Sequence, residues 1–178
     1  INHQAITAVD ESPLKKGLLY VGTDDGRVWI SLNDGGSWNE ISNGLPANAH
    51  VSRLVASKYN AATVYVTLSD RREDNISPYI FKSADMGKTW KPVAGNIPYS
   101  PVNVIREDPN KKNILYSVTD MGVYVSNTGG QKWIPLNNNL PAIVSVQDLF
   151  IHPKTNQLVI ATYGRGIYAL DDISILQK

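Results

Sequence analysis

The sequence contains no cysteine. This absence excludes disulfide bonds and thiolate metal sites, and it fits a reducing cytosol and a bacterial envelope equally well. An excess of charge of either sign is also missing, because 17 basic residues face 16 acidic ones and the formal net charge is +1. The basic residues form no long run, so the sequence predicts no nucleic-acid partner.

Long hydrophobic stretches are absent as well. No segment approaches the roughly 18 apolar residues of a membrane span. The first residues, Ile1 to Gln4, lack the charged start and apolar run of a signal peptide. We therefore expect neither a membrane span nor a leader in this chain. A hydrophobic content of 42% with 19% charged residues is typical of a folded globular domain.

Helical periodicity is missing too, and short apolar strands between Gly, Pro, Asn and Asp turns fill the chain in four repeats of about 43 to 52 residues. Three strands recur in each repeat, and a fourth begins at Trp38, Trp90 and Trp133, whereas the last repeat ends before such a tryptophan. The pattern predicts an all-β fold of β-propeller blades, each with about four antiparallel strands. We expect one propeller segment, 1–178, with repeats of approximately 1–46, 47–98, 99–141 and 142–178.

A similar eight-residue turn precedes each of the three tryptophans, at 31–38, 83–90 and 126–133. The middle turn reads S-A-D-M-G-K-T-W. A short Asx side chain bonds backbone amides across such a turn, glycine supplies a positive φ, and tryptophan fixes the hairpin against the blade. The first turn has Asn33 in place of aspartate, and the third has Thr128 and Lys132 at the Asp and Thr positions. We expect a structural role for Ser31, Asn33, Gly35, Trp38, Ser83, Asp85, Gly87, Thr89, Trp90, Ser126, Gly130 and Trp133.

These turns follow the Asp-box pattern S-x-D-x-G-x-T-W, and with the strand repeat the chain resembles the bacterial neuraminidase repeat (Asp-box) propellers. That set includes sialidases, xyloglucan-cleaving glucanases and sortilin-like receptor ectodomains. Segments 101–109 and 164–172 resemble large bacterial sortilin-like proteins that are often described as glycosyl hydrolases. The resemblance implies a secreted or extracytoplasmic bacterial protein and a chain that forms part of a larger propeller.

The resemblance also implies where ligands bind. In Asp-box propellers the boxes lie on the face opposite the functional one, so the functional face should hold the loops between second and third strands and those that enter the next repeat. Weak catalytic candidates there are Asp24, Asp25, Asp70, Asp74 and Asp120. Candidate ligand-binding residues are Arg71, Arg72, Tyr163 and Arg165.

Other chemistries find less support in the sequence. Arg53, Arg106 and Arg165 belong to different repeats and could together bind the carboxylate of a sialic acid, as arginines do in sialidases. The sequence has no Arg-Ile-Pro element ahead of the turns, which argues against sialidase activity. The three histidines are scattered without zinc-site spacing, and the Gly-rich segment 164–166 lacks the spacing of a phosphate loop. We expect no metal site and no cofactor.

Three functional hypotheses remain. The first is a non-catalytic propeller segment that presents loops to a protein, peptide or glycan. The second is a glycoside hydrolase, or part of one, acting on an extracellular polysaccharide through two facing carboxyl groups. The third is a purely structural fragment. Four repeats either close a small ring or form an open arc, whose terminal blades would pair with the remaining blades of a parent chain or with another copy.

Overall fold

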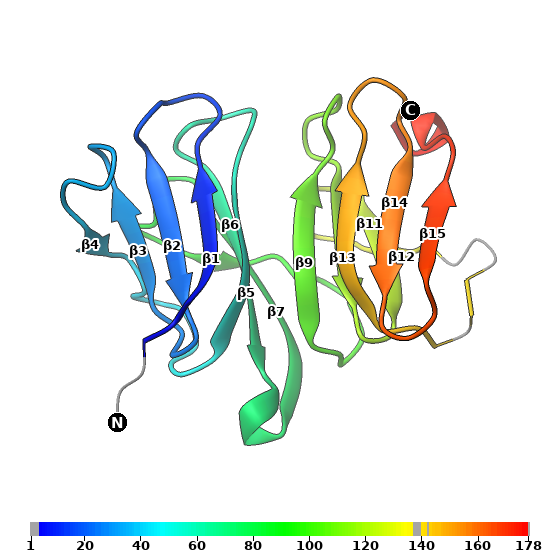
Figure 1. Cartoon of the computed structure of the whole chain (residues 1–178), viewed down its shortest axis with the longest axis horizontal. Helices are drawn as coiled ribbons and strands as arrows, with labels where there is room; N and C mark the ends of the chain where they lie inside the picture. The colour runs from blue at the N-terminus through cyan, green and yellow to red at the C-terminus, as the bar shows by residue number, and fades with distance from the viewer. Residues whose placement is uncertain (1–3, 137–139, 142, 178) are drawn as a thin grey trace.

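The computed structural model describes residues 4–136, 140–141 and 143–177, and it contains four antiparallel sheets (Figure 1). The all-β prediction and the propeller blades are confirmed. The strands are β1 (Ile6–Glu11), β2 (Leu19–Thr23), β3 (Val28–Ser31), β4 (Asn39–Glu40), β5 (His50–Ala56), β6 (Val64–Asp70), β7 (Asn75–Ser83), β8 (Lys91–Pro92), β9 (Val102–Glu107), β10 (Leu115–Thr119), β11 (Gly122–Ser126), β12 (Ile134–Pro135), β13 (Val146–Ile151), β14 (Leu158–Thr162) and β15 (Ile167–Leu170).

Each sheet is a meander in which sequential strands are neighbours. The first three have four strands, and the fourth has three, in the order β13-β14-β15. Two short 3₁₀ helices, η1 (Arg71–Glu73) and η2 (Ser174–Gln177), follow β6 and β15. No helix of the described residues is long and apolar enough to cross a membrane. We refer to the sheets in chain order as blades 1 to 4.

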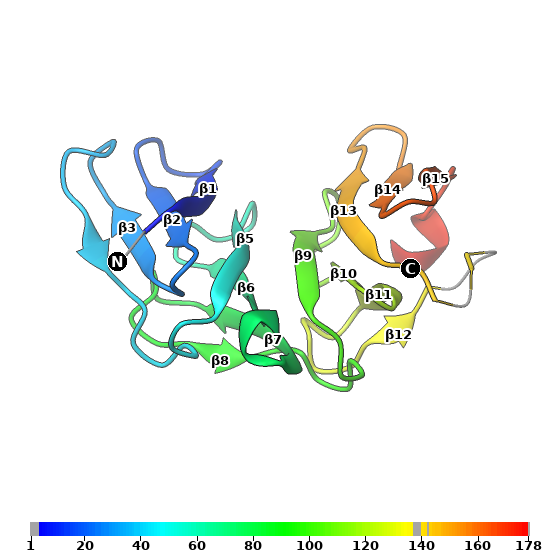
Figure 2. The same cartoon turned by 60° about the horizontal axis from the view of Figure 1, so that its bottom comes forward.

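The blades form a U-shaped arc (Figure 2). Their first strands line its inner side, where β1 lies against β5, β5 against β9, and β9 against β13. β1 and β13 lie at the two ends of the U, and over the described ranges no strand pairing joins blade 1 to blade 4. The four repeats therefore make an open arc and not a small closed ring.

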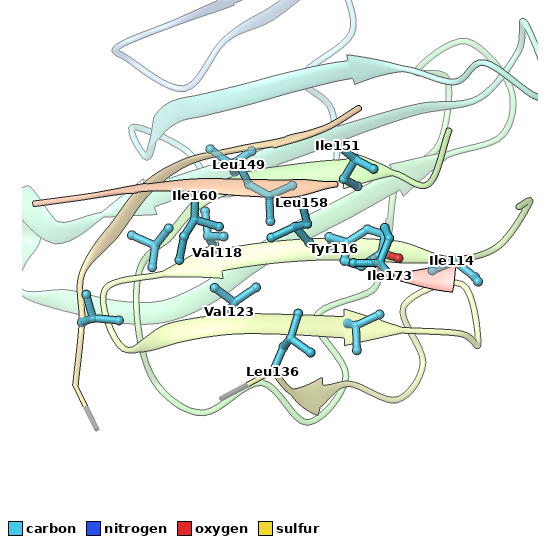
Figure 3. Packing of buried hydrophobic residues seen from close by; sticks show 14 residues of the cluster. Ile114, Tyr116, Val118, Val123, Leu136, Leu149, Ile151, Leu158, Ile160 and Ile173 are labelled. Atoms are coloured by element: carbon cyan, nitrogen blue, oxygen red, sulfur yellow. The ribbon is translucent and has the colours of Figure 1, made fainter. Parts of the chain in front are cut away.

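A separate hydrophobic cluster fills each space between neighbouring blades. The cluster of blades 3 and 4 places Tyr116 and Val118 of β10 against Leu149, Leu158 and Ile160 of the next blade (Figure 3). Equivalent clusters join blade 1 to blade 2 and blade 2 to blade 3. Because each blade buries its faces only against its neighbours, the stability of the arc depends on these three interfaces.

A polar side chain adds a hydrogen bond to every interface. In each first strand one residue lies in a bulge, where the register with the second strand shifts. A bulge redirects its side chain, and in blades 1 to 3 the redirected side chain reaches the first strand of the next blade. Thr7 Oγ1 donates to the Val51 carbonyl at 2.7 Å, Ser52 Oγ to the Val102 carbonyl at 2.8 Å, and Asn103 Nδ2 to the Val146 carbonyl at 2.8 Å.

The three turns 31–38, 83–90 and 126–133, which we call the box turns, join the third and fourth strands of blades 1 to 3. In the second, Asp85 accepts hydrogen bonds from Ser83 Oγ at 2.7 Å, from the Thr89 amide at 2.9 Å and from Thr89 Oγ1 at 2.7 Å. The Thr89 hydroxyl, followed by that of Ser83, lowers the pKa of Asp85 to about 2. The carboxylate is thus held inside its own turn.

Two box tryptophans also bind the preceding blade. Trp90 Nε1 donates to the Ile41 carbonyl at 2.7 Å, and Trp133 Nε1 donates to the Val93 carbonyl at 2.9 Å. Ile41 and Val93 directly follow the fourth strands of blades 1 and 2. The box turns of blades 2 and 3 therefore fasten these blades to the ones before them.

Candidate functional site

The turns between second and third strands project from one end of the blades, which is the lower end in Figure 1. The box turns lie at the opposite end of the third strands. Among the projecting turns, the one between β6 and β7 is extended by η1, which begins after Asp70 and ends at Asp74 in a left-handed conformation with φ of 56°. This helix gives blade 2 the two neighbouring cations Arg71 and Arg72.

A polar cavity of about 360 Å³ lies beside η1. It collects three guanidinium groups, one imidazole, two hydroxyls and two amides, and of the described residues no Asp or Glu lines it. Three lining residues are the bulge positions of blades 2, 3 and 4. The lining residues are His50, Ser52, Arg53, Ser69, Arg71, Arg72, Asn103 and Gln147.

Asp120 is fixed by donors from three blades. Its Oδ1 accepts from Asn103 Nδ2 at 3.1 Å and from Ser145 Oγ at 2.9 Å. Its Oδ2 forms an ion pair with Arg71 Nη2. Both oxygens are thereby occupied, and the carboxylate joins η1 of blade 2 to blade 3 and to the segment that enters blade 4.

Arg72 is the most available cation of the cavity. Its side chain is 69% exposed, and Nη1 lies 3.8 Å from Asp24 Oδ2. Asp24 also accepts from the Ala5 amide at 3.0 Å. Such an exposed and long ion pair contributes little to stability, so the Arg72 guanidinium is free to bind a ligand at little cost.

Arg53 and Arg106 converge on one carboxylate. Asp148 Oδ1 lies 3.2 Å from Arg53 Nη2 and 3.5 Å from Arg106 Nη2. Burial, followed by the neighbouring Arg53, lowers the pKa of Arg106, and Asp148 opposes the shift. Asp10 of β1 opposes the shift as well, so two carboxylates, Asp10 and Asp148, balance the two guanidinium groups on the inner side of the arc. Arg165, which the sequence grouped with them, is not in this cluster.

His50 contributes a neutral imidazole. Burial lowers its pKa, Arg72 lowers it further, and Asp24 opposes the shift. A pKa below the usual 6.5 leaves the ring uncharged at pH 7. Its Nδ1 is buried without a hydrogen-bond partner in the described structure. Sequence reasoning missed His50, because a lone histidine at the start of a strand carries no spacing signal.

The other predicted residues lie outside the cavity lining. Asp25 forms an ion pair with Arg27 at 3.3 Å in its own turn, and Asp70 accepts from Asn75 Nδ2 at 3.0 Å. Tyr163 and Arg165 are exposed in the turn between β14 and β15. The structure thus brings Arg71, Arg72, Asp24 and Asp120 together and leaves the rest dispersed. Within the described ranges no group of His, Asp and Glu has the arrangement of a metal site.

Asp120→Asn is expected to lower the free energy of unfolding by about 1–2 kcal/mol, because the ion pair with Arg71 loses its charge and an amide NH₂ replaces one acceptor. Asp74→Asn is the control, since asparagine tolerates the left-handed conformation and we expect a change below about 0.5 kcal/mol. Urea unfolding of both variants provides the measurement. Equal stability of the two variants would contradict the bridging role of Asp120.

Comparison with solved structures shows the β-propeller architecture. An ancestral GH74 enzyme matches with a TM-score of 0.72 and 21% identity over 88% of this chain and 22% of its own. The GH74 xyloglucanase from Xanthomonas campestris matches with a TM-score of 0.72 and 15% identity over 92% of this chain and 28% of its own. YCF48 bound to D1 peptide matches with a TM-score of 0.65 and 12% identity over 97% of this chain and 56% of its own.

The chain therefore spans less than a third of either GH74 enzyme and little more than half of YCF48. No family model and no curated protein matches the sequence. At these identities the likeness concerns the fold, and the site has to be interpreted from its own residues.

Proposed function

We propose that this chain is a non-catalytic, ligand-binding part of a β-propeller, and that its polar cavity holds a carboxylate-bearing segment of a protein or peptide. One observation carries the proposal: the cavity is lined by Arg53, Arg71 and Arg72 and by no acidic residue among those described. A planar guanidinium binds a carboxylate through two parallel hydrogen bonds, which makes arginine suited to this ligand.

The contacts of the arginines indicate different roles in binding. Arg71 is tied to Asp120, and Arg53 to Asp148, so both are held in position. Arg72 is largely exposed and only loosely paired with Asp24. We infer that Arg72 closes on the ligand, while Arg53 and Arg71, held in place by Asp148 and Asp120, offer the N–H groups that their ion pairs leave free. The neutral ring of His50 adds a hydrogen-bonding group that does not repel them.

The hydrolase hypothesis is the alternative, and it is supported by the fold shared with the GH74 enzymes. Glycoside hydrolysis requires two carboxyl groups that face one sugar, about 5 to 9.5 Å apart. Of the candidates nearest the cavity, Asp120 has both oxygens occupied and Asp24 is bound to Ala5 and Arg72. This use of the carboxylates favours binding over hydrolysis.

We also propose that the box turns are Asp-boxes, that the chain belongs to an extracytoplasmic protein, and that it is part of a larger propeller. The hydrogen bonds of Asp85 inside its turn support the first point. The location rests on the sequence resemblance. The match to 22% and 28% of two larger enzymes supports the last point.

Calorimetric titration with a short glutamate-rich peptide tests the binding proposal. The wild-type chain should bind the peptide, with affinity that decreases as salt is added. Arg72→Ala should weaken binding about 10-fold, the loss expected for one charge-assisted contact. Arg165→Ala is the matched control, because it removes an exposed arginine outside the cavity, and it should leave the affinity unchanged.

Two results would overturn this function. Equal loss of affinity in both variants would show that the peptide responds to overall charge and not to the cavity. Release of reducing sugar from xyloglucan by the chain, abolished by Asp24→Asn or Asp120→Asn, would establish the hydrolase instead.

A further inference from the structure

We propose that a second cavity, between blades 2 and 3 at the end of the box turns, binds a phosphate group. The cavity has a volume of about 300 Å³, at the lower end of the range for small-molecule sites. It shares no lining residue with the arginine-lined cavity. All its lining residues lie between positions 57 and 113, so neither end of the chain contributes to it.

The wall of this cavity is fixed by hydrogen bonds between the two blades. Glu107, at the end of β9, accepts from Ser57 Oγ at 2.8 Å and from the Lys58 amide at 2.9 Å. Tyr59 Oη donates to the Asp108 carbonyl at 2.8 Å. Glu107 is 8% exposed, and both of its oxygens are bonded to blade 2. This glutamate is therefore part of the wall, and a ligand meets the donors around it.

Two lysines bring positive charge to the cavity. Lys82 Nζ lies 5.5 Å from the centre of the Tyr65 ring, and Lys112 is exposed in the turn between β9 and β10. Over the residues that the structure describes, neither lysine forms an ion pair. Burial, followed by the charge of Glu107, raises the pKa of Tyr65, so its phenol stays neutral beside Lys82. Two ammonium groups without a paired carboxylate favour an anionic ligand.

Equivalent positions at the other two blade interfaces carry no charge. The register between second and third strands gives the equivalents of Lys82. Lys112 precedes a carbonyl that accepts an amide from beyond the third strand, and the same bond identifies its equivalents. The residues in place of the two lysines are Ile30 and Ala61 between blades 1 and 2, and Val125 and Thr155 between blades 3 and 4. The two lysines are therefore specific to the cavity between blades 2 and 3.

The corresponding place between blades 3 and 4 is occupied by a polar group of the chain itself. Gln177 of η2 donates from Nε2 to Asp108 Oδ2 at 2.9 Å and to Asn156 Oδ1 at 3.2 Å. Asp108 and Asn156 are the equivalents of Ser57 and Asn113, which line the cavity between blades 2 and 3. The place thus accommodates a hydrogen-bonding group. Between blades 2 and 3 it is an open cavity with cationic neighbours, which fits a ligand from outside the chain.

The donors of the cavity suit a tetrahedral oxyanion better than a carboxylate. Its two lysines come from different blades, and each ammonium group offers three N–H donors. Asn60 Oδ1 accepts from the Ala62 amide at 2.9 Å, which leaves the Asn60 NH₂ group to donate as well. A phosphate presents oxygens in several directions, and lysine binds it as a point charge. Among the described lining residues there is no arginine, whose fork pairs with a planar carboxylate.

An NMR titration of the isotope-labelled chain tests this site, with glucose 6-phosphate, inorganic phosphate and glucose as separate probes. The two phosphates should shift the amides of Asn60, Lys82 and Asn113 saturably, whereas glucose should leave them unmoved. The relative affinities distinguish free phosphate from a phosphorylated sugar as the source of the group. Lys112→Ala should raise the Kd for the phosphates at least about fivefold, the loss of one charge-assisted contact.

Lys111→Ala is the matched control, because it removes the neighbouring exposed lysine, which does not line the cavity. It should leave the Kd unchanged. Arg72→Ala should also leave it unchanged, since that residue belongs to the arginine-lined cavity, so the two sites are tested independently. Absence of shifts with both phosphates, equal weakening by Lys111→Ala and Lys112→Ala, or equal binding of glucose would each overturn the proposal.

Discussion

Trp133→Ala is expected to lower the free energy of unfolding by about 3–5 kcal/mol, the range for a large aromatic side chain removed from a core. Trp133 is 1% exposed and lies in the cluster between blades 2 and 3. The substitution also leaves the Val93 carbonyl without the indole donor at 2.9 Å. Urea unfolding followed by circular dichroism provides the measurement.

The equivalent tryptophan of blade 1 is the control for this experiment. Trp38 is 39% exposed, and no sheet of the described residues lies before its blade. Because its side chain is partly exposed, Trp38→Ala should cost less than about 1 kcal/mol. Similar losses for Trp38→Ala and Trp133→Ala would show that the tryptophan stabilises its own hairpin and not the contact between blades.

Gly87→Ala should cost about 3 kcal/mol or more, and Gly35→Ala only about 1 kcal/mol. Both glycines have a φ of +84°, so alanine is strained equally at the two sites. A Cβ at Gly87 would lie 2.3 Å from Ile41 Cδ1 and 2.9 Å from Ile41 Cβ, whereas at Gly35 the nearest atom is 3.8 Å away. The side-chain tip of Ile41 can rotate away, but its Cβ moves only with the backbone.

The difference between these two glycine variants isolates the contact between blades 1 and 2. Thermal unfolding and urea unfolding of the two purified variants measure it. If Gly87→Ala were no more destabilising than Gly35→Ala, the box turn of blade 2 would not pack tightly on blade 1, and the equivalence of blade interfaces would fail.

Sequence reasoning reached the fold because a propeller is built from local contacts. Each sheet is a meander of neighbouring strands, and Asp85 finds its partners within four residues. The alternation of apolar residues and the identity of the turn residues predict such short-range contacts directly. The missing fourth strand of blade 4 was visible for the same reason, as a repeat without its tryptophan.

The candidate site was harder to predict because its contacts cross the arc. Arg53 and Asp148 are 95 positions apart and meet only when three blades have the observed curvature. The sequence offered Asp24 and Asp120 among five weak catalytic candidates, whereas the structure joins these two to Arg72 and Arg71 of η1. The pairing of Arg71 and Arg72 with these aspartates depends on how far η1 projects from blade 2. The length of the loop alone does not determine how far the helix projects.

We propose that the arginine-lined cavity, and not the face of the box turns, binds the carboxylate-bearing ligand. An NMR titration of the isotope-labelled chain with the glutamate-rich peptide tests it most directly. If the cavity binds the peptide, saturable shifts are expected for the amides of His50, Ser52, Asn103 and Gln147 and for the guanidinium signal of Arg72, with the amides of Gly35, Gly87 and Gly130 unmoved. Shifts confined to those three glycines, or no shift at any of these groups, would contradict it.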